Sequence, residues 1–565
     1  MNMTIAPLIS KPINSVFTVE RIIIGYGAFV LLLGIGVFGY LMRALGYFSM
    51  IPGDLGDARF NSVVLEHGYQ WLFGQASQLW SPNYFYPFER VLGLSDGHFG
   101  SNWAYSLLRV CGLSREMAYS GWYFLGFLLN FLVCALVLRK LNYSVVAAAA
   151  GAFTFAFALP VLHQEGHAQL VYRFAIPLAC FFWYRAFAQR DSVQFAKAIF
   201  WCAVQFMCSI YLGVFLVYCL LAMLLVLVIV SVVGGSFRSE VVTAFNRHPD
   251  FGLCAKGARV IFLGSYFWYV LAILAMGAVF LLLHEYKSIA NDYHLVRPID
   301  DLRSLIPTPS SYLLADNSSL SRWVGSGVAN FPARSEHQMF IGFGALCLVM
   351  VGAWADAFAR ACLLTLLVLI GLTLMVADHS LYLWLLKLPG VDAIRAVSRI
   401  ILVMLFPISG LVAAGVDRLL RLTASRGLWF QASLLVAIIF FLSIESVYYQ
   451  PHQAAVQTWV DRQRGLASLI STDLPKDTIL FVTQRKAEPF YIAELDAMIY
   501  AQDHRLATLN GYSGSTPPGY VYPDPCLPSA ARLKAYFAYR KLSEVEQNKL
   551  LARLRVINLE GCLQR

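Results

Sequence analysis

The chain of 565 residues is 58% hydrophobic and only 13% charged, whereas soluble domains carry about 25% charged residues. This balance excludes an ordinary soluble enzyme, because a single soluble core stops growing near ~250 to 300 residues and cannot hide this much apolar surface. The net charge of +10 does not indicate a nucleic-acid partner, since no run of five or six basic residues occurs and Lys and Arg mainly report topology in membrane proteins.

Apolar runs that reach the length of a membrane crossing, or approach it within a helical bundle, predict about eleven transmembrane helices, since one crossing needs ~20 apolar residues. The segment 195–234 is about twice that length and is divided near Ser209 to Gly213. The predicted spans are 22–42, 120–138, 144–162, 173–188, 195–211, 212–234, 260–283, 339–355, 361–377, 400–417 and 428–447.

Basic residues gather in the short connections on one side of these spans, and Lys and Arg are retained in the cytoplasm. That side is therefore predicted to be cytoplasmic, together with an N-terminal tail of residues 1–21. The transmembrane module of residues 22–447 then places two large loops, 43–119 and 284–338, and the tail 448–565 on the opposite face. We expect a multi-pass protein of a bacterial inner membrane with its C-terminus outside the cytoplasm. The basic residues of the cytoplasmic side include Lys11, Arg21, Arg139, Lys140, Arg185, Arg238, Arg360, Arg418 and Arg421.

The tail 448–565 has the character of a small extracytoplasmic α/β domain. It contains a strand-like segment, Thr478–Thr483, a turn-rich segment, Asn510–Gly519, and a helix-like stretch over 528–556. The fold class is therefore an all-α polytopic membrane protein with extracytoplasmic loops and this added domain. Cys526 and Cys562 fall in this polar segment, where an oxidising compartment favours a disulfide between them.

The first outer loop opens with an acidic motif, Gly53-Asp-Leu-Gly-Asp57. Two carboxylates beside a membrane helix are costly to place near hydrocarbon unless they have a use. A carboxylate at Asp54 or Asp57 can accept a proton from a hydroxyl acceptor as a general base. The alternative is that Asp57 only caps the helix that follows, and the two roles are compatible.

The second outer connection contains three side chains of metal-binding types, His163, Glu165 and His167. In a helix the two histidines share one face and Glu165 points away, so only an extended segment aims all three in one direction. Gly166 permits that conformation. Two interpretations remain open, a site for a metal or a pyrophosphate group, and interfacial histidines that bond to backbone or lipid.

Arginines on the outer face depart from the charge rule and need a reason. Arginine suits bidentate recognition of phosphate, and the alternative is snorkelling of each side chain to ordinary lipid headgroups. Arg395 and Arg399, on one face at the start of a span, are the strongest candidates for binding a lipid phosphate, and Arg173 and Arg59 are further ones.

This layout resembles the GT-C superfamily of integral-membrane glycosyltransferases, which includes oligosaccharyltransferase catalytic subunits, protein O-mannosyltransferases and lipid A aminoarabinose transferases. The resemblance covers nearly the whole chain and rests on one span, a large outer loop that begins with Gly53-Asp-Leu-Gly-Asp57, further outer loops, about eleven spans and an extracytoplasmic C-terminal domain. Short segments at Tyr86-Pro-Phe88, Leu388-Pro-Gly390 and Asn510-Gly-Tyr-Ser513 are also reminiscent of bacterial membrane proteins of this type.

The resemblance implies a polyprenyl-phosphate-linked sugar as the donor, a lipid phosphate as the leaving group and inversion at the anomeric carbon. Asp57, or Asp54, becomes the base that activates a cell-envelope acceptor, and Arg395 with Arg399 would hold the leaving phosphate. The loop that carries a second acidic metal-binding motif in oligosaccharyltransferases has only one carboxylate here, within 163–167. A divalent metal is therefore an open question as cofactor.

Two other classes of function remain as alternatives. The first is a transporter or flippase of a lipid-linked saccharide, which would place charged and helix-breaking residues near the middle of several spans. Here the middle of the spans is almost wholly apolar and the polar residues cluster outside, which favours an enzyme. The second is a non-catalytic envelope scaffold, for which replacement of Asp54 or Asp57 would have no effect.

Overall fold

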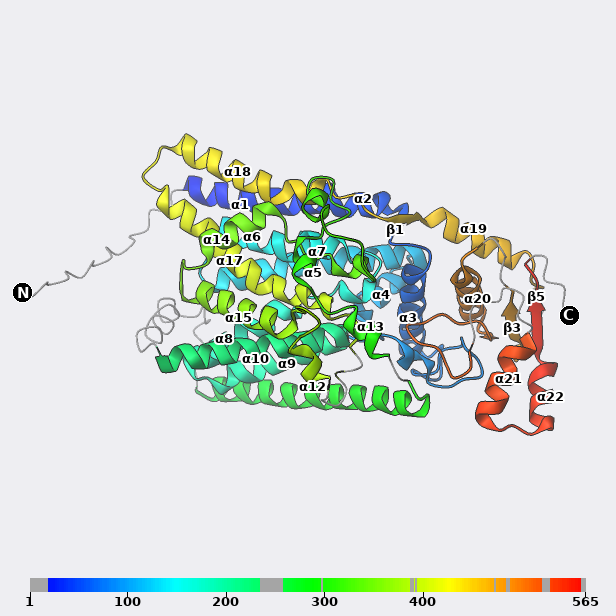
Figure 1. The fold of residues 1–565 in the computed structure, drawn as a ribbon. Helices are drawn as coiled ribbons and strands as arrows, with labels where there is room; N and C mark the ends of the chain where they lie inside the picture. The colour runs from blue at the N-terminus through cyan, green and yellow to red at the C-terminus, as the bar shows by residue number, and fades with distance from the viewer. Residues whose placement is uncertain are drawn as a thin grey trace, which may run out of the picture.

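The computed structural model of the protein describes residues 19–233, 258–295, 298–386, 391, 394–471, 474–483, 488–520 and 529–559. Long helices form a bundle, and the C-terminal helices and strands lie beyond one end of it (Figure 1). Within the described residues, seven helices are long and apolar enough to cross a membrane, so the chain is a polytopic integral membrane protein. These are Ile23–Ala44, Arg115–Lys140, Val145–Leu162, Ile210–Val232, Tyr266–Asp292, Val397–Leu422 and Trp429–Val447.

In the numbering of Figure 1, the first of these crossings is α1 (Val19–Gly34) continued by a π-helical stretch and by α2 (Met42–Ala44). The third crossing combines two helices, α6 and α7. The remaining elements of the seven are α5 (Arg115–Lys140), α6 (Val145–Phe157), α7 (Leu159–Leu162), α10 (Ile210–Val233), α12 (Ala258–Asp292), α17 (Ile401–Leu422) and α18 (Leu428–Val447).

The other predicted spans also coincide with helices, but with shorter ones. The division of segment 195–234 is confirmed, since α9 ends at Cys208, Ser209 is extended and α10 begins at Ile210. How many of the shorter helices cross the membrane is not settled by their length, so the total of about eleven stays a prediction. These helices are α8 (Ala175–Gln189), α9 (Ser192–Cys208), α14 (Phe343–Gly352) and α15 (Ala357–Thr373).

The centre of the bundle is built on α6 and α17. The apolar stretch of α17 is 100% buried, whereas only 17% of that of α12 is buried. Small residues make this packing possible, since a Cβ on Gly151 of α6 would lie 2.6 Å from the backbone oxygen of Ser409 on α17. Close backbone approach of this kind is how helices pack in a membrane, and the exposed apolar faces of α1, α12 and α18 are left for lipid.

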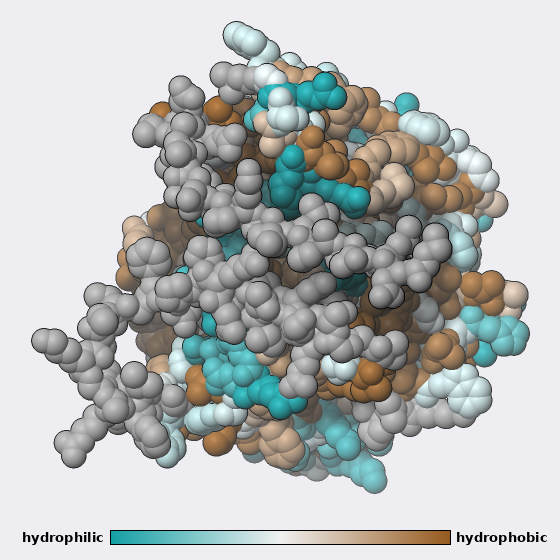
Figure 2. Space-filling view, turned by 90° about the vertical axis from the view of Figure 1, so that its left-hand side faces the viewer, coloured by the Kyte–Doolittle hydropathy of each residue, from teal (hydrophilic) through white to brown (hydrophobic). Residues whose placement is uncertain are grey.

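Figure 2 looks at the end of the bundle opposite the C-terminal elements, where the connection between α17 and α18 lies (Figures 1 and 2). Hydrophilic residues border the grey residues on this face, and hydrophobic residues flank them. This distribution fits a water-facing end of a bundle with lipid-facing sides. That this end is cytoplasmic stays a prediction.

At the other end of the bundle, the first outer loop and the last membrane helix are joined by a short sheet. Strand β1 (Met50–Pro52) pairs antiparallel with β2 (Gln453–Ala455), and Met50 faces Ala455. The loop then forms α3 (Asp57–Leu72) and α4 (Asn102–Val110), and the loop after α12 forms α13 (Ile299–Arg303) and several single turns. A short helix, α16 (Tyr382–Leu385), precedes the turn that leads into α17.

The C-terminal segment forms a three-stranded parallel sheet in the order β4-β3-β5, flanked by helices. Successive residues of β3 alternate between the two faces of the sheet. Ile479 packs with Leu533, whereas Leu480 packs with Leu466 and Ala497. The elements are α19 (Val456–Ala467), β3 (Ile479–Val482), α20 (Phe490–His504), β4 (Ala507–Thr508), α21 (Ser529–Arg540), α22 (Glu544–Ala552) and β5 (Leu554–Ile557).

Two sequence-based expectations for this segment need comment. The strand expected at 478–483 is present as β3, and the helix-like stretch expected over 528–556 is two helices, α21 and α22, followed by a strand. Ser543 caps a new helix, α22, after a break at Lys541, and the chain ends in strand β5. Cys526 and Cys562 lie outside the described residues, so their disulfide stays a prediction.

Candidate functional site

The acidic motif is held at the end of the bundle by a turn that only glycine allows. Gly53 has a φ of +83°, and a Cβ there would lie 2.8 Å from the Cα of Gly166. Its N–H donates to the backbone carbonyl of His452 at 2.8 Å, in the segment that leads into β2. The start of the first outer loop is therefore fixed against both the 163–167 loop and the chain after α18.

Asp54, and not Asp57, satisfies the start of α3. Oδ1 of Asp54 accepts hydrogen bonds from the backbone N–H of Gly56 at 2.9 Å and of Asp57 at 3.1 Å. Gly56 is the capping residue and Asp57 the first residue of the helix. The interpretation of Asp57 as a simple helix cap is therefore wrong, and its carboxylate is left for other partners.

The carboxylate of Asp57 accepts a hydrogen bond from the hydroxyl of Tyr512, at 2.7 Å, across 455 residues of sequence. Burial raises the pKa of Asp57, whereas the Tyr512 hydrogen bond and the positive charge of Arg399 oppose the rise. The negative charges of Asp54 and Glu336 add to it. Asp57 is thus a half-buried carboxylate among charges of both signs, with raised proton affinity.

Arg399 faces this carboxylate and is itself paired with Glu336. The pair is bidentate, with Nε at 3.0 Å from Oε2 and Nη2 at 2.7 Å from Oε1. His167 Nε2 lies 3.5 Å from the same carboxylate. Burial is the largest single influence and would raise the pKa of Glu336, but the charges of Arg399, His167 and Arg395 and the hydrogen bond from Arg399 together outweigh it. They lower that pKa to about 2, so Glu336 is a carboxylate at neutral pH.

Arg395 lies beside this pair with an exposed side chain. Its backbone N–H donates to the hydroxyl of Tyr211 at 3.1 Å, and the ring of the same tyrosine lies 5.5 Å from the guanidinium carbon of Arg399. Tyr211 therefore contacts both arginines, just before the N-terminus of α17. We refer to Asp54, Asp57, His167, Glu336, Arg395, Arg399 and Tyr512 as the Asp57 cluster.

A buried ion pair in the C-terminal segment holds the turn that carries Tyr512. Glu494 of α20 accepts from Arg532 at 2.6 Å and from the N–H of Gly511 at 2.9 Å. Asn510 donates to the same carboxylate at 3.0 Å. Glu494 is wholly buried, so these contacts hold the turn that places Tyr512 in the cluster.

Arg59 lies away from the Asp57 cluster, and its role in phosphate binding stays a prediction. Its guanidinium is buried, pairs with Asp496 of α20 and donates to the backbone oxygen of Leu55 at 2.6 Å. Asp496 is shared with Arg462 at 2.6 Å. These bonds occupy the donors of Arg59 in an interface between α3 and α20, with none directed to an open surface.

The three metal-type side chains of the second outer connection do not converge. Glu165 accepts from the N–H of His452 at 2.5 Å and from Tyr40 at 3.2 Å, while Nδ1 of His163 lies 3.2 Å from the hydroxyl of Tyr449. His167 turns instead to Glu336. In the part of the chain that the structure describes, no group of three or more His, Cys, Asp or Glu is placed to hold a metal ion.

These bonds give Glu165 a different role from the one its sequence pattern indicated. Burial raises its pKa to about 8, with the hydrogen bonds from His452 and Tyr40 opposing the rise. Through these hydrogen bonds the side chain of Glu165, in the 163–167 loop, connects the first crossing with the segment after α18. The predicted metal set, His163, Glu165 and His167, is therefore separated among three local contacts.

Arg173 is also not part of the Asp57 cluster. Its side chain is fully buried, its guanidinium carbon lies 5.0 Å from the centre of the Phe155 ring, and it lines a small cavity with Tyr123 and Gln164. This cavity has room for about one water molecule. A polyprenyl phosphate does not fit in this cavity, and the assignment of Arg173 to the lipid phosphate stays a prediction.

Sequence reasoning missed two residues of the cluster, Glu336 and Tyr512. Glu336 lies in the polar segment Arg334-Ser-Glu-His337, just before the apolar run that begins at Met339, and that position at a membrane boundary was the available signal. Tyr512 lies in the turn-rich segment of the tail. Nothing in its local pattern points to a carboxylate 455 residues away.

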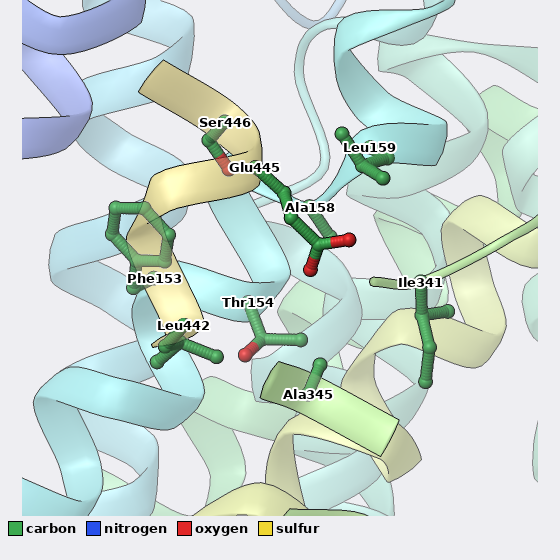
Figure 3. A pocket seen from close by; sticks show the side chains of 9 residues that line it. All are labelled: Phe153, Thr154, Ala158, Leu159, Ile341, Ala345, Leu442, Glu445 and Ser446. Carbon is green, nitrogen blue, oxygen red and sulfur yellow. The ribbon is translucent and has the colours of Figure 1, made fainter. Parts of the chain in front are cut away.

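A second cavity lies between α6, α18 and the start of α14, and Figure 3 shows the carboxylate of Glu445 projecting into it near Thr154 and Ile341. Glu445 accepts a hydrogen bond from Ser321. A Cβ at Gly342 would lie 2.5 Å from its Oε2, so the carboxylate sits against the first residues of α14. An acid at a helix N-terminus is stabilised there, which gives Glu445 a structural role.

No protein-family model and no curated protein sequence matches the chain. Among solved structures, the chain is similar to the crystal structure of the Archaeoglobus fulgidus oligosaccharyltransferase in complex with zinc and sulfate, with 12% sequence identity and a TM-score of 0.44. The match covers 85% of this chain and 62% of that one. The chain therefore spans less than two thirds of the length of that structure.

Proposed function

We propose that the protein is a membrane glycosyltransferase of the GT-C kind, which transfers a sugar from a polyprenyl-phosphate-linked donor to a cell-envelope acceptor on the extracytoplasmic face. The observation that carries the proposal is the position of Asp57. Asp54, and not Asp57, accepts the backbone hydrogen bonds at the start of α3. The carboxylate of Asp57 accepts a hydrogen bond from Tyr512 and is influenced by the charge of Arg399. This grouping of a carboxylate with arginines at the end of the bundle supports the proposal of a base beside cations for a phosphate.

In the proposed reaction, Asp57 accepts the proton of the acceptor's hydroxyl or amide group. The acceptor atom attacks the anomeric carbon, and the bond between that carbon and the phosphate oxygen breaks. The electron pair of that bond leaves with the lipid phosphate, and the configuration at the anomeric carbon is inverted. A base works best when its pKa lies near the operating pH, which fits the raised pKa of Asp57.

The arginines are assigned to the leaving phosphate. Arg395 has an exposed side chain and is the first cation that a lipid phosphate would meet. Arg399 is buried and already bound by Glu336 through two hydrogen bonds, so it supplies positive charge at a fixed position. Oriented charge in a site that excludes water stabilises charge that develops in the transition state. His167 lies beside Glu336 and has no assigned step in this reaction.

The proposal is tested by lipid analysis of a deletion strain. Mass spectrometry of polyprenyl-phosphate sugars and of the surface glycans would show one lipid-linked sugar that accumulates and one decoration that is lost. Complementation with the wild-type chain should restore both. The Asp57→Asn variant should restore neither, whereas Asp461→Asn, which changes an exposed carboxylate on α19, should restore both.

An unchanged lipid-linked pool with unchanged glycans would overturn the transferase proposal. Accumulation of the lipid-linked sugar with full rescue by Asp57→Asn would retain a transferase and remove Asp57 as its base. A lipid-linked sugar that is retained on the inner leaflet would instead indicate a flippase.

A further inference from the structure

Arg173 is a buried cation without a counter-charge among the described residues. Its side chain is 0% exposed, and Nε, Nη1 and Nη2 all lack a hydrogen-bond partner in the described part of the chain. A buried charge is normally paired or hydrogen-bonded, because removal of an ion from water is costly. The ring of Phe155, 5.0 Å from the guanidinium carbon, attracts the cation but does not carry a negative charge.

The guanidinium is held in this place by its backbone. The N–H of Arg173 donates to Oδ1 of Asn130 at 2.9 Å, and the Nδ2 of the same asparagine donates to the carbonyl of Val171 at 2.7 Å. Gln205 donates to the carbonyl of Tyr172 at 3.0 Å. Buried amide side chains therefore fix the backbone of three consecutive residues at this point, and the side chain of Arg173 is itself 0% exposed.

The guanidinium lines a small cavity, and a second polar group there is also unsatisfied. Oε1 of Gln164 is buried without a donor among the described residues. Rotation of the Gln164 amide exchanges its oxygen and nitrogen, so the residue can present N–H donors to the cavity. The remaining lining residues are mostly apolar, and the full set is Tyr123, Phe127, Val161, Gln164, Leu170, Val171, Arg173 and Leu402.

We propose that Arg173 and Gln164 bind one small monovalent anion, with chloride as the natural occupant, between α5, α7 and α17. A water molecule satisfies donors but leaves the buried charge uncompensated, whereas an anion does both. The cavity holds a single water-sized particle, so a tetrahedral phosphate or a carboxylate-bearing molecule is too large. This site is separate from the Asp57 cluster and does not depend on the proposed glycosyl transfer.

The direct test is a crystal structure of the wild-type protein grown in sodium bromide in place of chloride. Bromide scatters anomalously and is close to chloride in size. An anomalous peak within hydrogen-bond distance of the Arg173 guanidinium is the expected result. Water density at this position without an anomalous peak would overturn the proposal, and no variant is needed for this measurement.

A second test measures the apparent Tm of the purified protein in chloride and in gluconate at equal ionic strength, since gluconate is too large for the cavity. Saturable binding to the folded state should raise the apparent Tm by about 1 to 2 °C. Arg173→Met should abolish the chloride dependence, and Arg464→Met, which changes an exposed arginine on α19, should retain it. Equal Tm values for the wild type in the two salts would contradict the proposal.

Discussion

Asp57 and Glu165 are carboxylates from neighbouring outer segments, and both have a pKa raised by burial. Their partners differ. Asp57 meets a tyrosine hydroxyl and the charges of Arg399 and Glu336, whereas Glu165 meets a backbone N–H and the hydroxyl of Tyr40. A carboxylate is therefore assigned to the proposed chemistry in one place and to the architecture in the other, and the charged side chains that act on Asp57 separate the two roles.

The largest effect is expected when the base is removed. Asp57→Asn keeps the shape of the side chain but cannot accept a proton, so the rate of sugar transfer should fall by about 100- to 10,000-fold. The apparent Tm should stay close to that of the wild type, because the backbone hydrogen bonds at the start of α3 go to Asp54 and not to Asp57. Turnover of a lipid-linked donor in nanodiscs measures the first quantity, with Asp461→Asn as the control. A loss of activity accompanied by a marked fall in Tm would assign Asp57 a structural role, like that of Glu165.

Glu165→Gln should produce the opposite pattern. With a pKa near 8 in the folded protein and 4.5 as the ordinary value, Glu165 binds a proton between these limits that the unfolded chain has released. The free energy of unfolding of the wild type should therefore fall as pH rises from 5 to 8, by on the order of 3 kcal/mol. Glu165→Gln has no such titration, so its Tm should depend less on pH. A steep dependence retained in the variant would assign it to other groups.

Arg395→Ala should affect donor affinity with little effect on folding. The side chain is exposed, and loss of one phosphate contact should weaken apparent donor binding by about 10-fold, as for a charge-assisted hydrogen bond. Turnover of the bound donor should change less. Titration with a polyprenyl-phosphate sugar measures both quantities, with Arg464→Ala as the matched control. Unchanged donor affinity would remove Arg395 from the site.

The smallest effect is expected for Tyr512→Phe, which removes one hydrogen bond to Asp57. Transfer should slow by about 3- to 10-fold. Since the bond lowers the pKa of Asp57, its loss should move the acidic limb of the pH–rate profile to higher pH. Tyr491→Phe removes a longer contact, 3.4 Å from Asp54, and should leave the limb in place. A loss of rate without this shift would make Tyr512 a packing residue.

Local pattern was enough to find one half of the candidate site. The apolar runs gave the helices, and the charges at their ends gave Asp54, Asp57, Arg395 and Arg399, because a charge beside hydrocarbon needs a reason. This rule locates an unusual charged residue in the sequence. It does not identify the residue that pairs with it in the structure.

The other half depends on contacts between distant parts of the chain. Arg59 follows the acidic motif directly, yet its partner Asp496 is 437 residues away. Glu165 looked like a metal ligand until the fold placed the N–H of His452 against it. Glu336 has only its position beside an apolar run as a local signal, and Tyr512 has none that points to Asp57. Such pairings are set by tertiary packing, and single-sequence periodicity does not contain them.

The pairing of β1 with β2 also has a consequence for synthesis of the protein. Residues 50–52 find their partners at 453–455, so the ribosome must add about 400 residues after the acidic motif before the pair can form. At ~5 to 20 residues per second, this delay is roughly 20 to 80 s. During that interval the nascent chain exposes Asp54 and Asp57 without the strand that anchors them, and a chain that stops short of residue 450 never assembles the cluster.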